Sequence, residues 1–191
     1  NNNIKLGNET TELDVDNINS GNNVLIGNYS SKLLVNGKNN IAIGTKSNYY
    51  NINGDDNINI GNYSNFNNTG NDNLSLGNYS NYNNNSDNNL VFGNYAGYTM
   101  TDSINNIILG NNNTRNTSKN NNNVLIGNNA FMNSQSCNHN IVLGSSVGVN
   151  ASYSYRNIFL GYQTAYNSLS NRDSILIGFK NSLNIHINNC T

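Results

Sequence analysis

Residues 122–130 are Asn-Asn-Val-Leu-Ile-Gly-Asn-Asn-Ala, and closely similar stretches recur along the whole chain of 191 residues. When the stretches are aligned on their glycine, the pattern occurs eleven times. After a first interval of 20 residues, every interval is 16 or 17 residues. The repeat glycines are Gly7, Gly27, Gly44, Gly61, Gly77, Gly93, Gly110, Gly127, Gly144, Gly161 and Gly178. A fixed period indicates structural units that stack on their neighbours.

Each repeat places apolar residues three positions and one position before its glycine, as Val124 and Ile126 do around Gly127. Spacing by two and enrichment in β-branched residues predict a short strand, and we expect this pair to face inward. The sequence therefore predicts an all-β fold, a parallel β-solenoid (β-roll) of eleven coils of about 17 residues. We expect one domain over 1–191, with an irregular capping coil over 1–20 and the start of a further coil at 183–191.

The composition is unusual, with 54 Asn, 17 Gly and no Pro, and only 35% of the residues are hydrophobic. Such a polar chain would be disordered unless its few apolar residues were placed regularly, as they are here. The net charge is −1 and the basic residues form no stripe, so we expect no nucleic-acid partner. We also expect no membrane insertion, because no apolar run approaches the length of a spanning helix.

An asparagine precedes the predicted strand in successive repeats. Asparagine side chains stacked at the strand spacing can form amide ladders, so we expect a ladder along the solenoid. Its predicted members are Asn23, Asn40, Asn57, Asn73, Asn89, Asn106, Asn123, Asn140 and Asn157. Codon bias toward Asn is the alternative, and the scarcity of Lys weakens it.

The residue between the two paired positions is also apolar in eight repeats, with Lys5, Asn59 and Ser75 as exceptions. Because the pair is assigned to the interior, we expect this central residue to point outward. An exposed apolar stripe of that length is unusual for a monomer, so we predict that copies associate along the rod axis. A monomer that displays the stripe to a ligand is the alternative. The predicted interface residues are Leu25, Ala42, Val91, Ile108, Leu125, Val142, Phe159 and Leu176.

The repeats resemble those of a known family. Residues 39–47 and 122–130 are similar to head repeats of trimeric autotransporter adhesins, and residues 158–167 to related repeats of phage and viral fibre proteins. The resemblance covers nearly the whole chain and implies a homotrimer of left-handed parallel β-rolls with strands facing the three-fold axis. The adhesin unit is shorter, so the extra residues here imply a wider loop.

These features predict a non-enzymatic structural or adhesive fibre module. Its trimeric head would present a polar surface for attachment to a host cell or matrix, through a surface protein or a glycan. The alternative is a purely architectural component of a virion or appendage without its own ligand. Both roles predict an extracellular location, on a cell surface or on a virion surface.

Candidate contact residues lie two positions after a repeat glycine, at Tyr29, Tyr63, Tyr79 and Tyr95. Tyrosine is a good contact residue for sugars and proteins. A row of tyrosines along a solenoid edge can also serve only to shield the backbone, and that alternative is favoured.

Two kinds of side-chain group in the sequence could bind a metal ion. Cys137 and His139 are two residues apart, but no second pair supports a site. Carboxylates in corresponding turns could form a row for Ca²⁺, although solvated turn residues are the favoured interpretation. These carboxylates are Asp55, Asp56, Asp72 and Asp87, with a weaker set at Glu9, Glu12, Asp14 and Asp16. We therefore expect no metal and no cofactor. No nucleophile–base–acid set or nucleotide-binding fingerprint is present in the sequence, so we expect no enzymatic activity.

Overall fold

The computed structural model describes residues 2–10 and 20–181, and every regular element within them is a β-strand. Eleven strands form one parallel sheet, here called the long sheet, in which neighbours follow chain order except where a strand of a second sheet intervenes. The predicted all-β parallel solenoid is confirmed. The strands of the long sheet are β1 (Ile4–Leu6), β2 (Val24–Ile26), β3 (Ile41–Ile43), β4 (Ile58–Ile60), β5 (Leu74–Leu76), β6 (Leu90–Phe92), β7 (Ile107–Leu109), β8 (Val124–Ile126), β10 (Ile141–Leu143), β12 (Ile158–Tyr162) and β14 (Ile175–Phe179).

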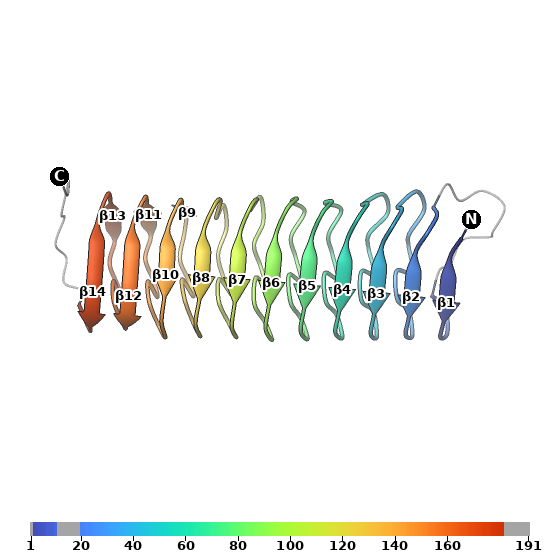
Figure 1. Cartoon of the computed structure of the whole chain (residues 1–191), viewed down its shortest axis with the longest axis horizontal. Coiled ribbons are helices and arrows are strands. Elements are labelled where there is room, and N and C mark those ends of the chain that lie inside the picture. Colours follow the sequence, from blue (N-terminus) through green and yellow to red (C-terminus); the bar gives the residue numbers. More distant parts are fainter. Residues whose placement is uncertain (1, 11–19, 182–191) are drawn as a thin grey trace.

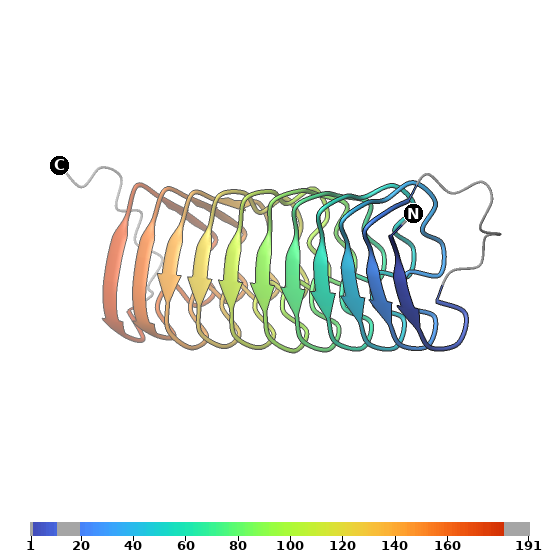
Figure 2. The same ribbon diagram turned by 45° about the vertical axis from the view of Figure 1, so that its right-hand side comes forward.

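The coils stack into a rod whose strands lie across its long axis (Figure 1). Figure 2 shows the second wall of the rod behind the long sheet. Equivalent residues pair in adjacent coils without slippage, as Leu125 pairs with Ile108 and with Val142. With about 4.8 Å between neighbouring strands, the rod is about 50 Å long.

A second, short sheet forms at the C-terminal end of the rod. Its strands are β9 (Cys137–Asn138), β11 (Tyr153–Tyr155) and β13 (Ser170–Arg172), all parallel. Figure 1 shows them behind β10, β12 and β14, on the wall opposite the long sheet. Half of the expected capping coil (residues 1 and 11–19 of 1–20) and the whole of the expected further coil (183–191) lie outside the described residues.

The strand faces are the reverse of the sequence-based assignment. The second residue of each long-sheet strand from β2 onward is buried inside its own coil, whereas Ile126, predicted to face inward, is 40% exposed. The predicted interface between copies is therefore wrong, because its residues form the interior of a single chain. All eight are buried: Leu25, Ala42, Val91, Ile108, Leu125, Val142, Phe159 and Leu176.

The asparagine ladder explains why the central residues face inward. Its side chains are buried, and each Oδ1 accepts the backbone N–H of the equivalent residue one coil further on, at 2.8–3.1 Å. Each Nδ2 donates across the coil to a backbone carbonyl at 2.6–3.0 Å. The predicted ladder is confirmed. Residues two apart in a strand share a face, so a buried asparagine places the central strand residue inside as well.

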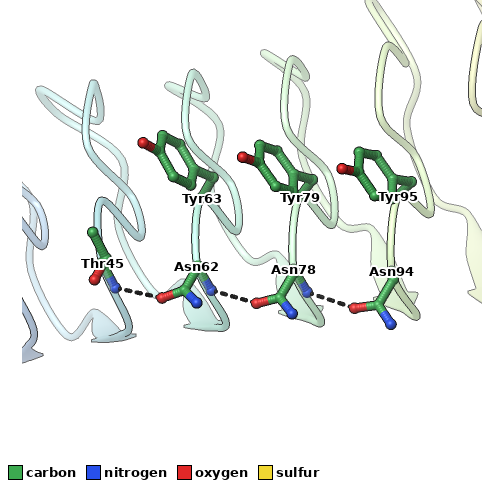
Figure 3. Close-up of a pocket in the computed structure, with 7 residues that line it drawn as sticks. All are labelled: Thr45, Asn62, Tyr63, Asn78, Tyr79, Asn94 and Tyr95. Carbon is green, nitrogen blue, oxygen red and sulfur yellow. Dashed lines mark hydrogen bonds between the residues drawn. The ribbon is translucent and has the colours of Figure 1, made fainter.

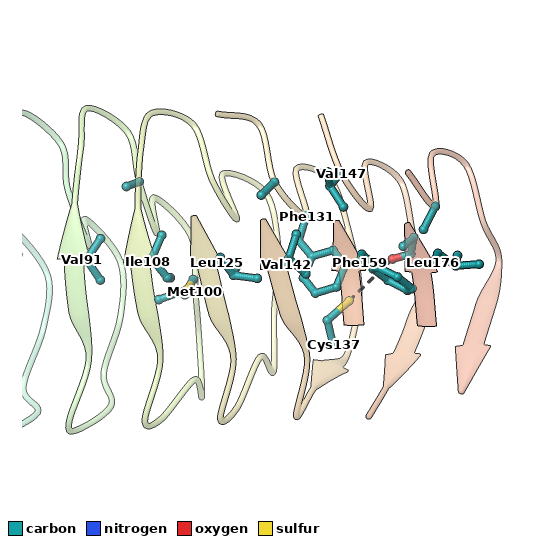
Figure 4. Close-up of a cluster of buried hydrophobic side chains, with 14 residues drawn as sticks. Val91, Met100, Ile108, Leu125, Phe131, Cys137, Val142, Val147, Phe159 and Leu176 are labelled. Carbon is teal, nitrogen blue, oxygen red and sulfur yellow. Dashed lines mark hydrogen bonds between the residues drawn. The ribbon is translucent and has the colours of Figure 1, made fainter. Parts of the chain in front are cut away.

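The interior changes character along the rod. Buried polar residues outnumber buried hydrophobic ones by 36 to 18 among the described residues. One apolar cluster runs from Val91 to Leu176 and includes Phe131 against Phe159 (Figure 4). In β4 and β5 the central positions are Asn59 and Ser75, whose side-chain polar atoms have no hydrogen-bond partner in the structure. The middle of the rod therefore has a polar interior.

The first and third residues of the long-sheet strands form the apolar outer face of the rod. Every one of these 22 positions holds Ile, Leu, Val or Phe. They are partly or largely exposed, from the intermediate Ile41 to Leu6 at 66%. The pairs are Ile4/Leu6, Val24/Ile26, Ile41/Ile43, Ile58/Ile60, Leu74/Leu76, Leu90/Phe92, Ile107/Leu109, Val124/Ile126, Ile141/Leu143, Ile158/Leu160 and Ile175/Ile177.

Candidate functional surface

A column of stacked tyrosines lies just beyond the C-terminal ends of the long-sheet strands. The rings of Tyr63 and Tyr79 are 5.0 Å apart and nearly parallel, and those of Tyr79 and Tyr95 are 4.9 Å apart. All three residues have φ near +55°, a left-handed conformation that bulky residues seldom adopt. The sharp bend after each repeat glycine holds them in this conformation and aligns the rings.

Tyr29, the fourth predicted contact residue, is separated from this column by one coil. Lys46 occupies the equivalent position in that coil, and its Nζ lies 6.0 Å from the Tyr29 ring centre and 5.3 Å from that of Tyr63. At the other end, the Arg115 guanidinium lies 4.9 Å from the ring centre of Tyr95. Cations therefore cover both ends of the three-ring stack.

A second aromatic column runs beside the first. Tyr49, Phe66, Tyr82 and Tyr98 lie five residues after their repeat glycines and stack at 4.8–5.3 Å. Burial raises the pKa of Tyr82, and the neighbouring tyrosines raise it further. This column is absent from the sequence-based predictions, although the recurrence of aromatic residues at the repeat spacing indicates it.

A shallow groove of about 560 Å³ is lined by the three stacked tyrosines together with Thr45, Asn62, Asn78 and Asn94 (Figure 3). The Oδ1 atoms of the three asparagines accept backbone N–H groups from the preceding coil at 3.0–3.1 Å. The ring faces of the tyrosines are covered by one another and by the flanking cations. The groove thus offers amide nitrogens, ring edges and hydroxyl groups to a partner, and no aromatic face for a sugar.

The short sheet carries a second groove, of about 390 Å³, lined by residues that include Tyr153, Tyr155 and Arg172. Beside it, Arg156 donates two hydrogen bonds to Asp173, at 2.6 and 2.8 Å. This pairing raises the pKa of Arg156 and lowers the pKa of Asp173. The guanidinium groups of Arg156 and Arg172 lie 4.8 and 5.5 Å, respectively, from the Tyr155 ring centre. This cluster is absent from the sequence-based predictions, although Arg156 and Asp173 are 17 residues apart, like other neighbours in a column.

Cys137 and His139 do not converge. Cys137 is buried, and burial raises the pKa of its thiol to about 12. His139 is exposed, has φ +59°, and places its ring 5.3 Å from that of Tyr155. The left-handed residue interrupts the strand alternation, so positions two apart face different ways.

The turn aspartates fall into two columns. Asp55 and Asp87 accept backbone N–H groups at 2.7 Å with Asn71 between them, and Asp56 accepts from the Asn39 amide at 2.9 Å. Glu9 pairs with Lys32 at 2.9 Å, whereas Glu12, Asp14 and Asp16 lie outside the described residues. Within 2–10 and 20–181, no three His, Cys, Asp or Glu side chains form a group that could hold a metal ion.

No family model, curated protein or solved structure matches the chain. None of the described residues belongs to a helix long and apolar enough to cross a membrane.

Proposed function

We propose that the chain is a non-enzymatic fibre module that assembles with copies of itself, as a homotrimer, through the apolar outer face. The remaining polar surface would serve for attachment to a host cell or matrix. This assembly and role place the protein on a cell surface or a virion surface.

The apolar outer face carries the proposal. Its two rows of side chains are about 7 Å apart and about 50 Å long, which with side-chain width covers roughly 600 Å². That area is at the upper end of the largest apolar patch found on a typical monomer, about 300–600 Å². No position of either row holds a polar or charged residue, although the chain as a whole is only 35% hydrophobic. Such selective placement favours burial of this face.

A second copy of the chain is the partner that fits this face best. An occupant must offer apolar groups at each of eleven levels with the same strand spacing of about 4.8 Å. Another copy does so because its own outer face has that period. The number three and the left-handed winding rest on the resemblance to trimeric adhesin heads, and both remain predictions.

Attachment is assigned to the wall opposite the long sheet. The short-sheet groove lies there and presents Tyr153, which is 59% exposed, together with Tyr155 and Arg172. Exposed tyrosine and arginine side chains are frequent anchors in protein–protein contacts. This wall remains accessible when the apolar outer face is covered.

The attachment role is tested by the binding of the labelled rod to an array of glycans and matrix proteins. We expect saturable binding that is lost in Tyr153→Ala/Tyr155→Ala, while the control Tyr50→Ala binds like the wild type. Tyr50 is similarly exposed but lies on a different part of the rod. Binding that both variants retain would reject the assigned groove.

A purely architectural role is the second candidate. It is favoured by the outer asparagines and aromatic rings, which largely bond or stack with one another instead of remaining available. A rod that binds no glycan or protein on the array, yet assembles with copies of itself, would support this candidate.

A further inference from the structure

The two edges of the long sheet differ in chemistry over the same three coils. After β4, β5 and β6, the chain turns through Tyr63, Tyr79 and Tyr95, which form the tyrosine edge of the rod. Before the same strands, the turns hold carboxylates that form the acidic edge. These are Asp55, Asp56, Asp72 and Asp87. In Figure 1 the strands run from the acidic edge at the top to the tyrosine edge at the bottom.

An acid before the strand and a tyrosine after it occur together only in these coils. The preceding coil has Lys38 and Asn39 before its strand and Lys46 after it, and the following coil has Ile104, Asn105 and Asn112. Neither therefore has an acid or a tyrosine at these positions. Two other coils have one of the groups without the other: Tyr29 has no acid before its strand, and Asp173 lies before a strand that is followed by Lys180. Acid before and tyrosine after the strand thus occur together in three consecutive coils.

A contact within one chain does not explain this match. Asp72 and Tyr79 lie beyond opposite ends of β5, and the seven residues of chain between them span at most about 23 Å. The carboxylate of Asp72 is exposed and forms no hydrogen bond or ion pair with a described residue. The hydroxyl groups of Tyr63, Tyr79 and Tyr95 likewise form no hydrogen bond within the described residues. The tyrosine hydroxyls and the Asp72 carboxylate are therefore unpaired, whereas Asp55, Asp56 and Asp87 each accept one hydrogen bond within the chain through Oδ1, which leaves Oδ2 for a partner.

Rotation about an axis parallel to the rod brings these edges together. In a cyclic assembly that buries the apolar outer face, one edge of each long sheet lies beside the opposite edge of the next copy. A pure rotation does not shift copies along the axis, so equal coils meet to within about one strand spacing of 4.8 Å. The three tyrosine coils then face the three acidic coils of the neighbour.

We propose that the tyrosine edge of one copy binds the acidic edge of the next, with tyrosine hydroxyls donating to aspartate carboxylates at the same level of the rod. This inference rests on the proposed assembly and adds the residues that set its register. A hydroxyl donating to a carboxylate forms a short, charge-assisted hydrogen bond. Lys46 and Arg115 beside the tyrosines make that edge electropositive, which complements the carboxylates.

The contact is tested by disulfide cross-linking of Asp72→Cys/Tyr79→Cys, in a chain whose Cys137 and Cys190 are replaced by Ala and Ser. Under mild oxidation we expect covalent dimers and trimers on a non-reducing gel, and no larger species, because a cyclic trimer closes. The matched control is Asn122→Cys/Tyr79→Cys, in which the new cysteines lie three coils apart. It should remain uncross-linked.

Isosteric variants provide a second measurement that does not depend on new cysteines. In Asp55→Asn/Asp72→Asn/Asp87→Asn we expect subunit exchange to be at least about tenfold faster than in the wild type. Absence of cross-links with unchanged exchange, in a chain that still assembles, would overturn the contact and leave the proposed function standing. Cross-linking of the Asn122 control alone would also overturn it. A chain that is monomeric in solution would contradict both the contact and the proposed assembly.

Discussion

At the scale of single residues, the buried asparagines carry much of the role that apolar side chains have in other cores. Asn106 accepts the backbone N–H of Asn123 at 3.1 Å and donates to the carbonyl of Asn120 at 2.6 Å. It therefore joins two coils and also the two walls of one coil. Removal of such an amide leaves its buried partners without a hydrogen bond. The protein then loses more free energy of unfolding than an average hydrogen bond contributes.

We expect Asn106→Ala to lower the free energy of unfolding by about 2–4 kcal/mol, because the buried Asn123 N–H and Asn120 carbonyl both lose their side-chain partner. Urea unfolding followed by circular dichroism measures the change. The control is Asn116→Ala, at an exposed asparagine that donates to Asn133 at 2.7 Å. Its effect should stay within about 0.5 kcal/mol. Equal losses in the two variants would contradict a structural role of the buried ladder.

The repeat glycines allow backbones of adjacent coils to approach closely. A Cβ at Gly77, which has φ +132°, would lie 2.5 Å from the Gly93 carbonyl oxygen. Gly77→Ala should therefore lower the free energy of unfolding by about 2 kcal/mol or more. Gly21→Ala is the matched control, because nothing lies within 4 Å of its Cβ, and it should change stability by less than about 1 kcal/mol. The melting temperatures of both variants, measured by thermal unfolding, test this prediction. Comparable values would refute the close approach of the backbones.

At the scale of the strands, the repeat period made the existence and spacing of the elements predictable but not their faces. In β8, Val124, Leu125 and Ile126 are all apolar, so alternation alone does not identify the inward residue. Asn59 and Ser75 favoured an outward assignment, because polar residues are usually exposed. The decisive signal was Asn123, since a shielded amide ladder requires Leu125, two residues later, to face inward.

The candidate surface was likewise predictable only in part. The repeat positions identified the tyrosine row, but the stacking with Lys46 and Arg115 depends on how the turns bend. The Asp columns depend on left-handed residues such as Asp56, with φ +58°, that interrupt the strand alternation. A period in the sequence places residues at the same level of the rod, whereas the direction of a side chain depends on backbone dihedral angles at each turn.

The face assignment predicts opposite outcomes for two adjacent substitutions. Leu125→Asp buries a charge in the interior of its own coil and should lower the free energy of unfolding by about 3 kcal/mol or more. Ile126→Asp changes a residue that is 40% exposed on the apolar outer face, and the all-β circular dichroism of the chain should remain. Loss of the fold in Ile126→Asp but not in Leu125→Asp would reverse the assignment.

At the scale of the whole molecule, the walls of the rod have different chemistry. The long sheet presents only apolar side chains at its first and third strand positions, and the opposite wall carries exposed tyrosine and arginine in the short sheet. The polar interior around Asn59 and Ser75 contributes little apolar burial within one chain. Burial of the outer face between copies would add the apolar contact that a single rod lacks.

Absolute molar mass, measured by light scattering during gel filtration at micromolar concentration, tests the burial of this face most directly. The chain has a mass of 20.9 kDa, and we predict a single species of three times that mass. A species of 20.9 kDa would contradict the account, because the apolar outer face would then be exposed to water in the stable form of the protein.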